Sequence, residues 1–195
     1  MPLLSFCLFV LVSSFTPGPN NFMAMSFANK YGFKSSIKFC FGVAAGFFLL
    51  AFLCSIFNHL LINVLPLIKV PLTILGVGYM LYLAYKIMTS KEGTKEENEK
   101  NDKNLFLIGT LVQFINPKGI LYGLTVVTSF ILPYYTSYLS FLVFSLFLGA
   151  VGLLSSACWG LFGSILEKYL TKHRKLFNIT MGLLLVYSAV SIVFH

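Results

Sequence analysis

Charge is scarce in this sequence. Only 10% of its 195 residues are charged, and Asp and Glu together occur six times. A soluble domain of this length carries far more charge on its surface. Instead, 57% of the residues are hydrophobic, Phe alone occurs 21 times, and the mean hydropathy is +0.86. This composition predicts an all-α membrane protein that crosses the bilayer several times and has no separate soluble domain.

Motifs of enzymes and of ATP-driven machines are missing as well. The sequence contains neither a Walker-type loop nor a dinucleotide fingerprint, which argues against ATP-driven transport by this chain alone. None of its four cysteines belongs to a Cys-x-x-Cys pair, so neither a metal site nor a redox pair is indicated. We expect no enzyme, no cofactor and no metal, and we expect small buried hydrophobes at Cys7, Cys40, Cys54 and Cys158.

Six apolar segments of about 20 residues or more divide the chain, and each can cross a hydrocarbon core of ~30 Å as a helix. They span residues 2–28, 39–62, 67–89, 105–130, 137–165 and 176–194. The first segment lacks the basic start and the small-residue cleavage site of a signal peptide, so we expect it to be retained as a span. The longest connection, residues 90–104, is almost wholly polar or charged, which indicates a solvated loop.

The basic residues predict an orientation. A net charge of +8 would suit nucleic-acid binding, but the lysines and arginines lie in short gaps between apolar segments. The first, third and fifth gaps hold twelve of them, whereas the second and fourth gaps hold only Lys69. Cytoplasmic loops of membrane proteins carry such an excess of Lys and Arg. We therefore expect no nucleic-acid partner, cytoplasmic odd-numbered loops, and both termini on the outer side.

The two halves of the sequence match weakly when they are shifted by about one hundred residues. Thr16-Pro17 aligns with Asn116-Pro117, and Tyr82 aligns with Tyr187. Each half holds three segments, an odd number, so the second half must enter the membrane from the opposite side. We interpret the chain as one transmembrane transporter domain with two inverted three-helix repeats. The domain covers residues 1–195, with repeats at 1–89 and 105–195 and a cytoplasmic loop at 90–104.

Helix-breaking residues interrupt the first and fourth segments. The stretch SSFTPGPNN at 13–21 contains two prolines and a glycine, and NPKG at 116–119 contains one of each. At ~1.5 Å per residue, Thr16 lies roughly 20 Å and Asn116 roughly 17 Å into its segment, near the midplane of the bilayer. Irregular backbone persists at that depth only against protein or a wet cavity. Paired breaks in two halves are the best sequence pointer to a transport site.

The residues at the breaks suit a zwitterionic ligand. Each break starts a half-helix whose free N–H groups can hold a carboxylate, with Pro19 or Pro117 in the first turn and Asn116 as a cap. Lys118 lies deep in its segment, which indicates function, although it could instead cap carbonyls across the break. Packing kinks are the alternative explanation of the prolines. We predict a substrate-binding site at Thr16, Pro17, Gly18, Pro19, Asn20, Asn21, Gln113, Asn116, Pro117 and Lys118, with Ser13 and Ser14 as further hydrogen-bonding groups.

These motifs carry a resemblance to a known family. TPGPNN at 16–21, GVAAG at 42–46 and NPKG at 116–119 resemble the lysine-exporter superfamily and, within it, the homoserine/threonine exporters of amino acids. The match in segment order and length covers essentially the whole chain. The stretches SFTPGPNN, ILYG, FILP, CWGLFG and LLLVYSAV are most similar to the cysteine/O-acetylserine exporter subgroup.

The resemblance implies a proton-driven secondary transporter that exports small neutral amino acids or their derivatives across the bacterial inner membrane. The termini would then be periplasmic. Its partners would be a small amino-acid substrate and the lipid bilayer, and a homo-oligomer is left open. By position, the two family motifs carry over to Pro17, Gly18, Pro19 and Asn20 and to Asn116, Pro117 and Lys118.

Two other functions stay open. A membrane thiol or electron carrier with inverted repeats would need two cysteines that can form a disulfide, and a membrane scaffold without transport would tolerate alanine at Pro17 and Pro117. The coupling mechanism is open too, because all six acidic residues fall in or beside the predicted cytoplasmic loops. Lys118 and Tyr122 are the titratable residues that we expect near the midplane.

Overall fold

The computed structural model describes residues 1–89, 104–165 and 174–193, and within these ranges the chain is helical with no strand. The helices are α1 Leu3–Phe15, α2 Pro19–Tyr31, α3 Phe33–Ile56, α4 Asn58–Met88, α5 Leu105–Ile115, α6 Pro117–Val126, the π-helix η2 Val127–Ile131, α7 Tyr138–Ile165 and α9 Arg174–Val193. The predicted all-α fold is confirmed. Almost all of the predicted loop at 90–104 lies outside the described residues, as does Glu167.

The first and fourth predicted segments are each broken into two helices. α1 and α2 meet at 46°, and α5 meets α6 with η2 at 67°. Pro19 and Pro117 are the first residues of α2 and α6, where a proline costs no helical hydrogen bond because that N–H has no helical partner in any case. The two predicted breaks are confirmed at the positions of TPGPNN and NPKG.

Apolar length divides the described helices into two groups. α3 and α7 are long and apolar enough to cross a membrane, and each bent pair passes the same test when it is taken as one span. α4 and α9 contain shorter apolar stretches, Thr73–Tyr85 and Lys175–Val190. At ~1.5 Å per residue, α7 extends about 42 Å, more than the thickness of the hydrocarbon core.

The predicted boundary between the second and third segments, at residues 63–66, is wrong. α3 ends at Ile56, only Phe57 separates it from α4, and α4 then runs through Pro66 and Pro71. An internal proline is a weak signal of a helix end in an apolar chain. The proline leaves one carbonyl without its helical partner, whereas ending the helix would leave several backbone groups without hydrogen bonds in lipid.

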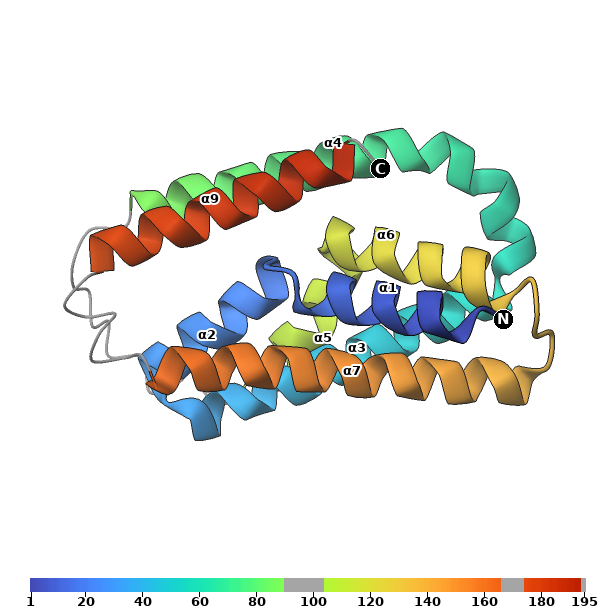
Figure 1. The fold of residues 1–195 in the computed structure, drawn as a ribbon, viewed down its shortest axis with the longest axis horizontal. Coiled ribbons are helices and arrows are strands. Elements are labelled where there is room, and N and C mark those ends of the chain that lie inside the picture. Colours follow the sequence, from blue (N-terminus) through green and yellow to red (C-terminus); the bar gives the residue numbers. More distant parts are fainter. Residues whose placement is uncertain (90–103, 166–173, 194–195) are drawn as a thin grey trace.

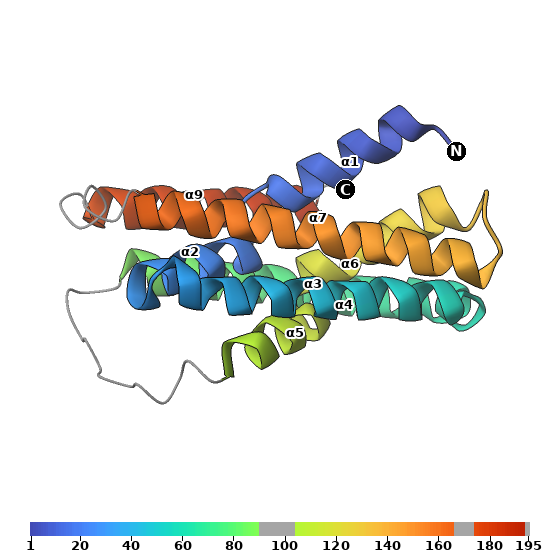
Figure 2. The same ribbon diagram turned by 90° about the horizontal axis from the view of Figure 1, so that it is seen from below.

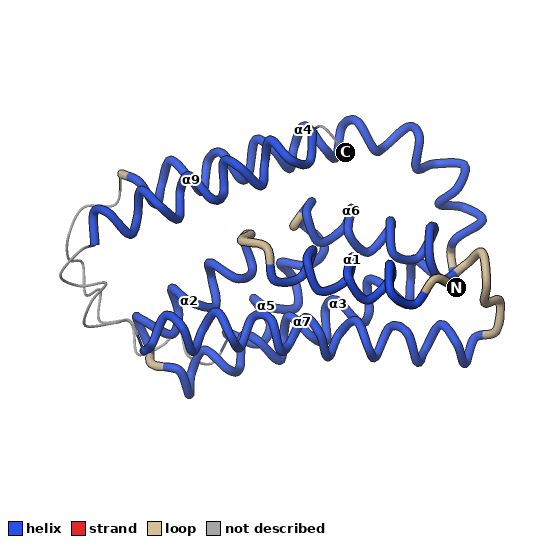
Figure 3. The backbone as a smooth tube through the Cα atoms, in the orientation of Figure 1, coloured by secondary structure: helices blue, strands red, loops and turns tan. Residues whose placement is uncertain are grey.

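The long helices form two layers (Figures 1 and 2). α3 packs along α7, and α4 packs along α9. In Figure 2, α7 and α9 make one layer and α3 and α4 the other, with α2 and α6 between them. α1 and α5 project from opposite faces of this arrangement. The backbone trace in Figure 3 shows each break as a short non-helical segment. Gly18 in the first break and Asn116 in the second are buried.

α3 and α5 cross closely because their contact is lined by glycines. A Cβ on Gly42 would overlap the carbonyl oxygen of Phe106, and a Cβ on Gly46 would overlap that of Thr110. Gly109 meets the α3 backbone in the same way from the α5 side. The Gly42-x-x-x-Gly46 pattern therefore serves helix packing, as such small-residue patterns do in membranes.

The cysteines do not all lie in the core. Cys40 is buried and Cys54 is half-buried, but Cys7 and Cys158 are exposed, and all four are free. The expectation of small buried hydrophobes is therefore wrong for Cys7 and Cys158. In a membrane protein the lipid tails supply apolar surroundings, so an apolar segment does not require its small residues to face the protein interior.

Candidate functional site

The end of α1 carries backbone carbonyls that the helix cannot satisfy. In a continuous helix the Phe15 carbonyl would accept a hydrogen bond from the N–H of residue 19, but Pro19 has none. Trp159 on α7 takes this place, since its indole Nε1 donates to the Phe15 carbonyl at 3.2 Å. A side chain from the second half of the chain thus completes the first break.

The neighbouring carbonyls are paired with side chains too. Ser14 O accepts from Asn21 Nδ2 at 2.9 Å and from Ser155 Oγ at 2.7 Å. Asn21 Nδ2 also donates to Thr16 O at 3.1 Å. Because lipid offers no hydrogen-bond donor, these partners from α2 and α7 make the irregular backbone tolerable inside the bundle.

Lys118, at the second break, binds the first break. Its Nζ donates to Thr16 O at 2.7 Å and to Pro17 O at 3.3 Å. Ser188 on α9 donates to the same Pro17 carbonyl at 2.7 Å. The lysine therefore places a positive charge at the C-terminal end of α1, where the helix dipole is negative. Gly18 leaves it room, because a Cβ there would come within 2.9 Å of Lys118 Cδ.

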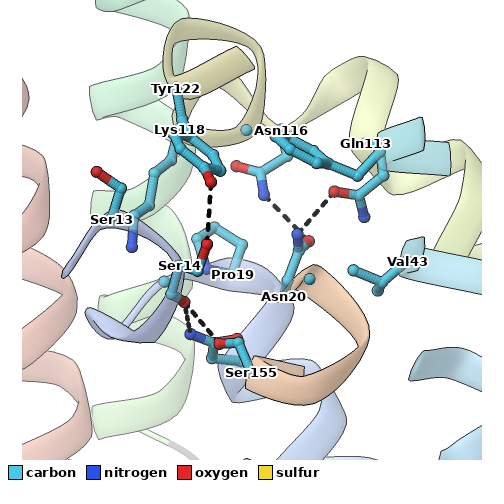
Figure 4. Close-up of a pocket in the computed structure, with 15 residues that line it drawn as sticks. Ser13, Ser14, Pro19, Asn20, Val43, Gln113, Asn116, Lys118, Tyr122 and Ser155 are labelled. Carbon is cyan, nitrogen blue, oxygen red and sulfur yellow. Dashed lines mark hydrogen bonds between the residues drawn. The ribbon is translucent and has the colours of Figure 1, made fainter. Parts of the chain in front are cut away.

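Three side-chain amides join the two breaks (Figure 4). Gln113 Nε2 donates to the Gly109 carbonyl at 2.9 Å, and Gln113 Oε1 accepts from Asn20 Nδ2 at 2.8 Å. Asn116 Nδ2 then donates to Asn20 Oδ1 at 3.0 Å. Asn116 occupies the cap position of α6, but its side chain makes no cap hydrogen bond, so the predicted capping role is wrong. Its amide is committed to Asn20 instead.

α2 and α6 begin close together and run toward opposite ends of the bundle (Figures 1 and 2). Neither helix has a side-chain cap at its start. The N–H groups of the first turn lack helical acceptors, namely those of Asn20 and Asn21 in α2 and of Lys118 and Gly119 in α6. Since an uncapped helix start carries partial positive charge, both first turns favour negative charge nearby.

A small pocket lies between the two breaks, with a volume of about 50 Å³ in this conformation. Tyr122 forms part of its wall, stacks on Phe47 at a centroid distance of 5.0 Å, and accepts a hydrogen bond from Ser14 Oγ at 3.2 Å. A water molecule needs about 10–15 Å³, so the pocket has room for a few waters and must widen around an amino acid. The lining residues are Ser13, Ser14, Gly18, Pro19, Asn20, Asn21, Val43, Phe47, Gln113, Asn116, Lys118, Gly119, Tyr122, Gly152 and Ser155.

Most of the predicted site residues line this pocket. Thr16 and Pro17 are not among its lining residues, and their carbonyls accept hydrogen bonds from Lys118, which does line it. Pro117 packs against α4, where a Cβ on Gly76 would overlap the proline ring. The predicted residues that do line the pocket are Gly18, Pro19, Asn20, Asn21, Gln113, Asn116 and Lys118.

Five lining residues were named neither in the predicted site nor as titratable candidates. Gly119 belongs to the NPKG motif in α6. Val43 and Phe47 come from α3, and Gly152 and Ser155 come from α7. Val43 and Phe47 carry no signal, because an apolar side chain looks the same in sequence whether it faces a core or a pocket. Ser155 carries one, since two adjacent serines are unusual in the middle of an apolar segment.

The chemistry of the pocket favours a small zwitterion. Its lining residues supply two helix starts and one cation but include no Asp or Glu. These groups favour a carboxylate. The pocket also has a free acceptor, because the buried Asn116 Oδ1 has no hydrogen-bond partner within the described structure. A ligand with both a carboxylate and a donor group would use both features.

Comparison with known proteins agrees with this chemistry. The family profile of LysE type translocators matches residues 11–195. The cysteine/O-acetylserine efflux protein of Escherichia coli strain K12 is 35% identical over 189 residues, which cover 96% of this chain and 95% of that protein. The cysteine/O-acetylserine efflux protein of Salmonella typhimurium strain LT2 is 36% identical over 193 residues, which cover 98% and 97%. No solved structure matches this chain. The chain belongs to the LysE type translocator family.

Proposed function

We propose that this protein is a secondary transporter that exports a small neutral amino acid across the bacterial inner membrane. The family and the relatives named for cysteine/O-acetylserine efflux favour a cysteine- or O-acetylserine-like substrate over a homoserine- or threonine-like one. The observation that carries the proposal is the pocket between the two helix breaks, which is lined by two uncapped helix starts.

In this proposal the substrate carboxylate binds at the first turns of α2 and α6. Polar side chains around it hydrogen-bond the rest of the substrate, while Gly18 and Pro19 allow close approach of the backbone. Thr16, Pro17 and Pro117 act indirectly, because they shape the breaks and hold Lys118. The pocket volume of about 50 Å³ favours a small substrate over a peptide.

We propose a single transporter domain with six spans in two inverted repeats, in which α4 and α9 are the third and sixth spans. Two observations support this arrangement. The first and fourth spans are bent by 46° and 67° at corresponding prolines. α1 and α5 project from opposite faces of the bundle, as a two-fold relation between the halves requires (Figure 2).

For the orientation, we propose that the basic loops are cytoplasmic and both termini periplasmic. α2, α4 and α7 end, and α9 begins, at one end of the bundle, opposite the N-terminus (Figure 1). Tyr134 and Tyr138, which are 53% and 72% exposed, lie near the other end and suit an outer interfacial belt. Alkaline phosphatase fused after His195 should be active, and the same enzyme fused at Thr94 should be inactive; the reverse pattern contradicts this orientation.

Transport would proceed by alternating access, with one repeat rocking against the other and the breaks as hinges. The proton gradient, which the family resemblance implies, is the proposed driving force. Lys118 and Tyr122 are the titratable side chains in the pocket wall and are therefore the candidates for coupling. The acidic residues are not candidates for proton coupling, because they occur only at residues 92–102 and 167, in or beside the proposed cytoplasmic loops.

Efflux from loaded cells tests the proposal. Cells expressing the wild type and preloaded with dipeptides that supply cysteine or threonine should release one or two small amino acids faster than control cells. Asn116→Ala and Pro17→Ala should reduce the gain at least about tenfold at matched protein levels. Gly78→Ala is the matched control, because a Cβ at this exposed glycine meets no atom within 4 Å. No gain for any amino acid in the wild type would contradict the proposal.

A further inference from the structure

Asn116 presents a buried acceptor without a donor. Its side chain is only 2% exposed, and Oδ1 has no hydrogen-bond partner within the described structure. In Figure 4 this oxygen points away from Asn20, on the side of the pocket where Tyr122 and Lys118 lie. A buried polar atom without a partner is costly, and native proteins rarely keep one unless a ligand or a water completes it.

The direction of the neighbouring hydrogen bonds determines which atom of Asn116 is left over. The chain of amides ends at the backbone carbonyl of Gly109, which can only accept. Gln113 must therefore direct Nε2 to this carbonyl and Oε1 to Asn20. Asn20 then donates with Nδ2 and accepts with Oδ1. Asn116 must use Nδ2 for Asn20, which leaves Oδ1 for the pocket.

We infer that Asn116 Oδ1 accepts a hydrogen bond from the α-ammonium group of the exported amino acid, and that Gln113 and Asn20 are positioning residues that keep this oxygen turned toward the pocket. The inference rests on the proposed export function and adds which group of the substrate is recognised and by which atom. It also predicts that the transporter requires a free α-ammonium group.

The surroundings favour an ammonium donor from the ligand. Lys118 already donates to Thr16 O and Pro17 O, and Ser155 already donates to Ser14 O. A ligand carboxylate would be repelled by the amide oxygen, whereas it is attracted to the uncapped starts of α2 and α6. The two ends of a zwitterion therefore have different binding positions in the same pocket, which sets the orientation of the substrate.

The amide chain also connects this recognition to both repeats. Asn20 belongs to the first break, whereas Gln113 and Asn116 belong to the second. If the two breaks separate during transport, the bond between Asn20 and Asn116 must break, and Asn116 is then free to turn. The affinity for the ammonium group would fall in the same movement that opens the pocket, which would favour release.

Cysteine and 3-mercaptopropionate provide the test, because they differ only in the α-ammonium group. Inverted membrane vesicles take up labelled, reduced cysteine in the export direction, and unlabelled compounds compete for this uptake. We expect 3-mercaptopropionate to compete at least about 10-fold more weakly than cysteine with the wild type, the range of a hydrogen bond to a charged group. Equal competition by the two compounds would overturn the inference.

Variants then assign the effect to Asn116. Asn116→Leu should weaken competition by cysteine about 10-fold or more and leave 3-mercaptopropionate unchanged, whereas Asn116→Asp keeps an acceptor and should keep the discrimination. Gln113→Leu should reduce the discrimination in part, because Asn20 loses the acceptor that orients it. A similar loss for both compounds in Asn116→Leu would overturn the inference and leave a water as the partner of Oδ1.

Failure of the inference can be distinguished from failure of the proposed function. If wild-type vesicles take up neither labelled cysteine nor labelled O-acetylserine above the background of empty vesicles, the proposed substrate class is wrong. If they take up either compound but its analogue without the amino group competes equally well, the proposed export function is supported and the proposed role of Asn116 is wrong. The unfolding midpoint of each purified variant in detergent shows that the comparison is made between folded proteins.

Discussion

Lys118 Nζ donates to the Thr16 carbonyl at 2.7 Å, although the two residues are 102 positions apart. The lysine belongs to the second break and the carbonyl to the first. Each break therefore depends on the other for its hydrogen bonds, and the pocket between them is a property of both halves together. We therefore expect a substitution at either break to alter the hydrogen bonding of the other.

The charge of Lys118 can be separated from its capping role. We expect Lys118→Gln to fold nearly as well as the wild type, because Asn21 and Ser188 still donate to the two carbonyls that the lysine serves. Transport should nevertheless fall at least about tenfold, since the cation that favours the carboxylate is lost. Efflux per molecule and the unfolding midpoint in detergent are measured on the same preparations. Full transport by the glutamine variant would mean that Lys118 is a structural cap only.

Trp159→Phe should destabilise the first break. The Phe15 carbonyl loses the indole donor that replaces the missing N–H of Pro19. Because lipid offers no replacement donor, we expect a cost of about 1–3 kcal/mol. A lower unfolding midpoint in detergent checks this. Tyr187→Phe is the control, because the 66% exposed Tyr187 should be indifferent to loss of its hydroxyl within about 0.5 kcal/mol. Equal midpoints for the two variants would show that the indole bond adds nothing.

Gly109→Val should separate α5 from α3. A side chain at this position meets the carbonyl oxygen of Phe39, and backbone cannot give way as a flexible side chain can. We expect a cost of about 1–3 kcal/mol or more and loss of the monodisperse peak in size-exclusion chromatography. Gly78→Val, where a Cβ meets nothing within 4 Å, should leave the peak unchanged. Matching profiles would contradict a tight crossing of α3 and α5.

Gly152→Ala should narrow the substrate range. The added methyl group would have Val43 Cγ1 as its nearest neighbour at 3.9 Å, so it fits without strain but takes up pocket volume. Export of O-acetylserine should fall about tenfold more than export of cysteine, the range expected for one methyl group in a binding pocket. The ratio of the two efflux rates, compared with that of Gly78→Ala, checks this. An unchanged ratio would place the side chain of the substrate elsewhere.

The positions of the helix breaks could be predicted because their cause is local. Pro17, Pro19 and Pro117 lack an N–H wherever the chain goes, so a helix cannot continue through them with its full set of hydrogen bonds. Pro66 and Pro71 show the limit of the same argument. They lie inside α4, and nothing in their local sequence distinguishes them from the prolines that do break a helix.

The sequence was enough to predict an apolar, all-helical protein, the positions at which its first and fourth segments break, and the polar residues that gather at the breaks. The tertiary structure alone decided which atom faces which. Trp159, Ser155 and Ser188 reach the end of α1 from positions more than 140 residues away. Asn116 Oδ1 is left free because the Gly109 carbonyl on α5 fixes the orientation of the Gln113 amide, which in turn fixes that of Asn20. Such pairings depend on how helices distant in sequence pack, and an apolar helix face has the same composition whether it meets lipid, another helix or a pocket.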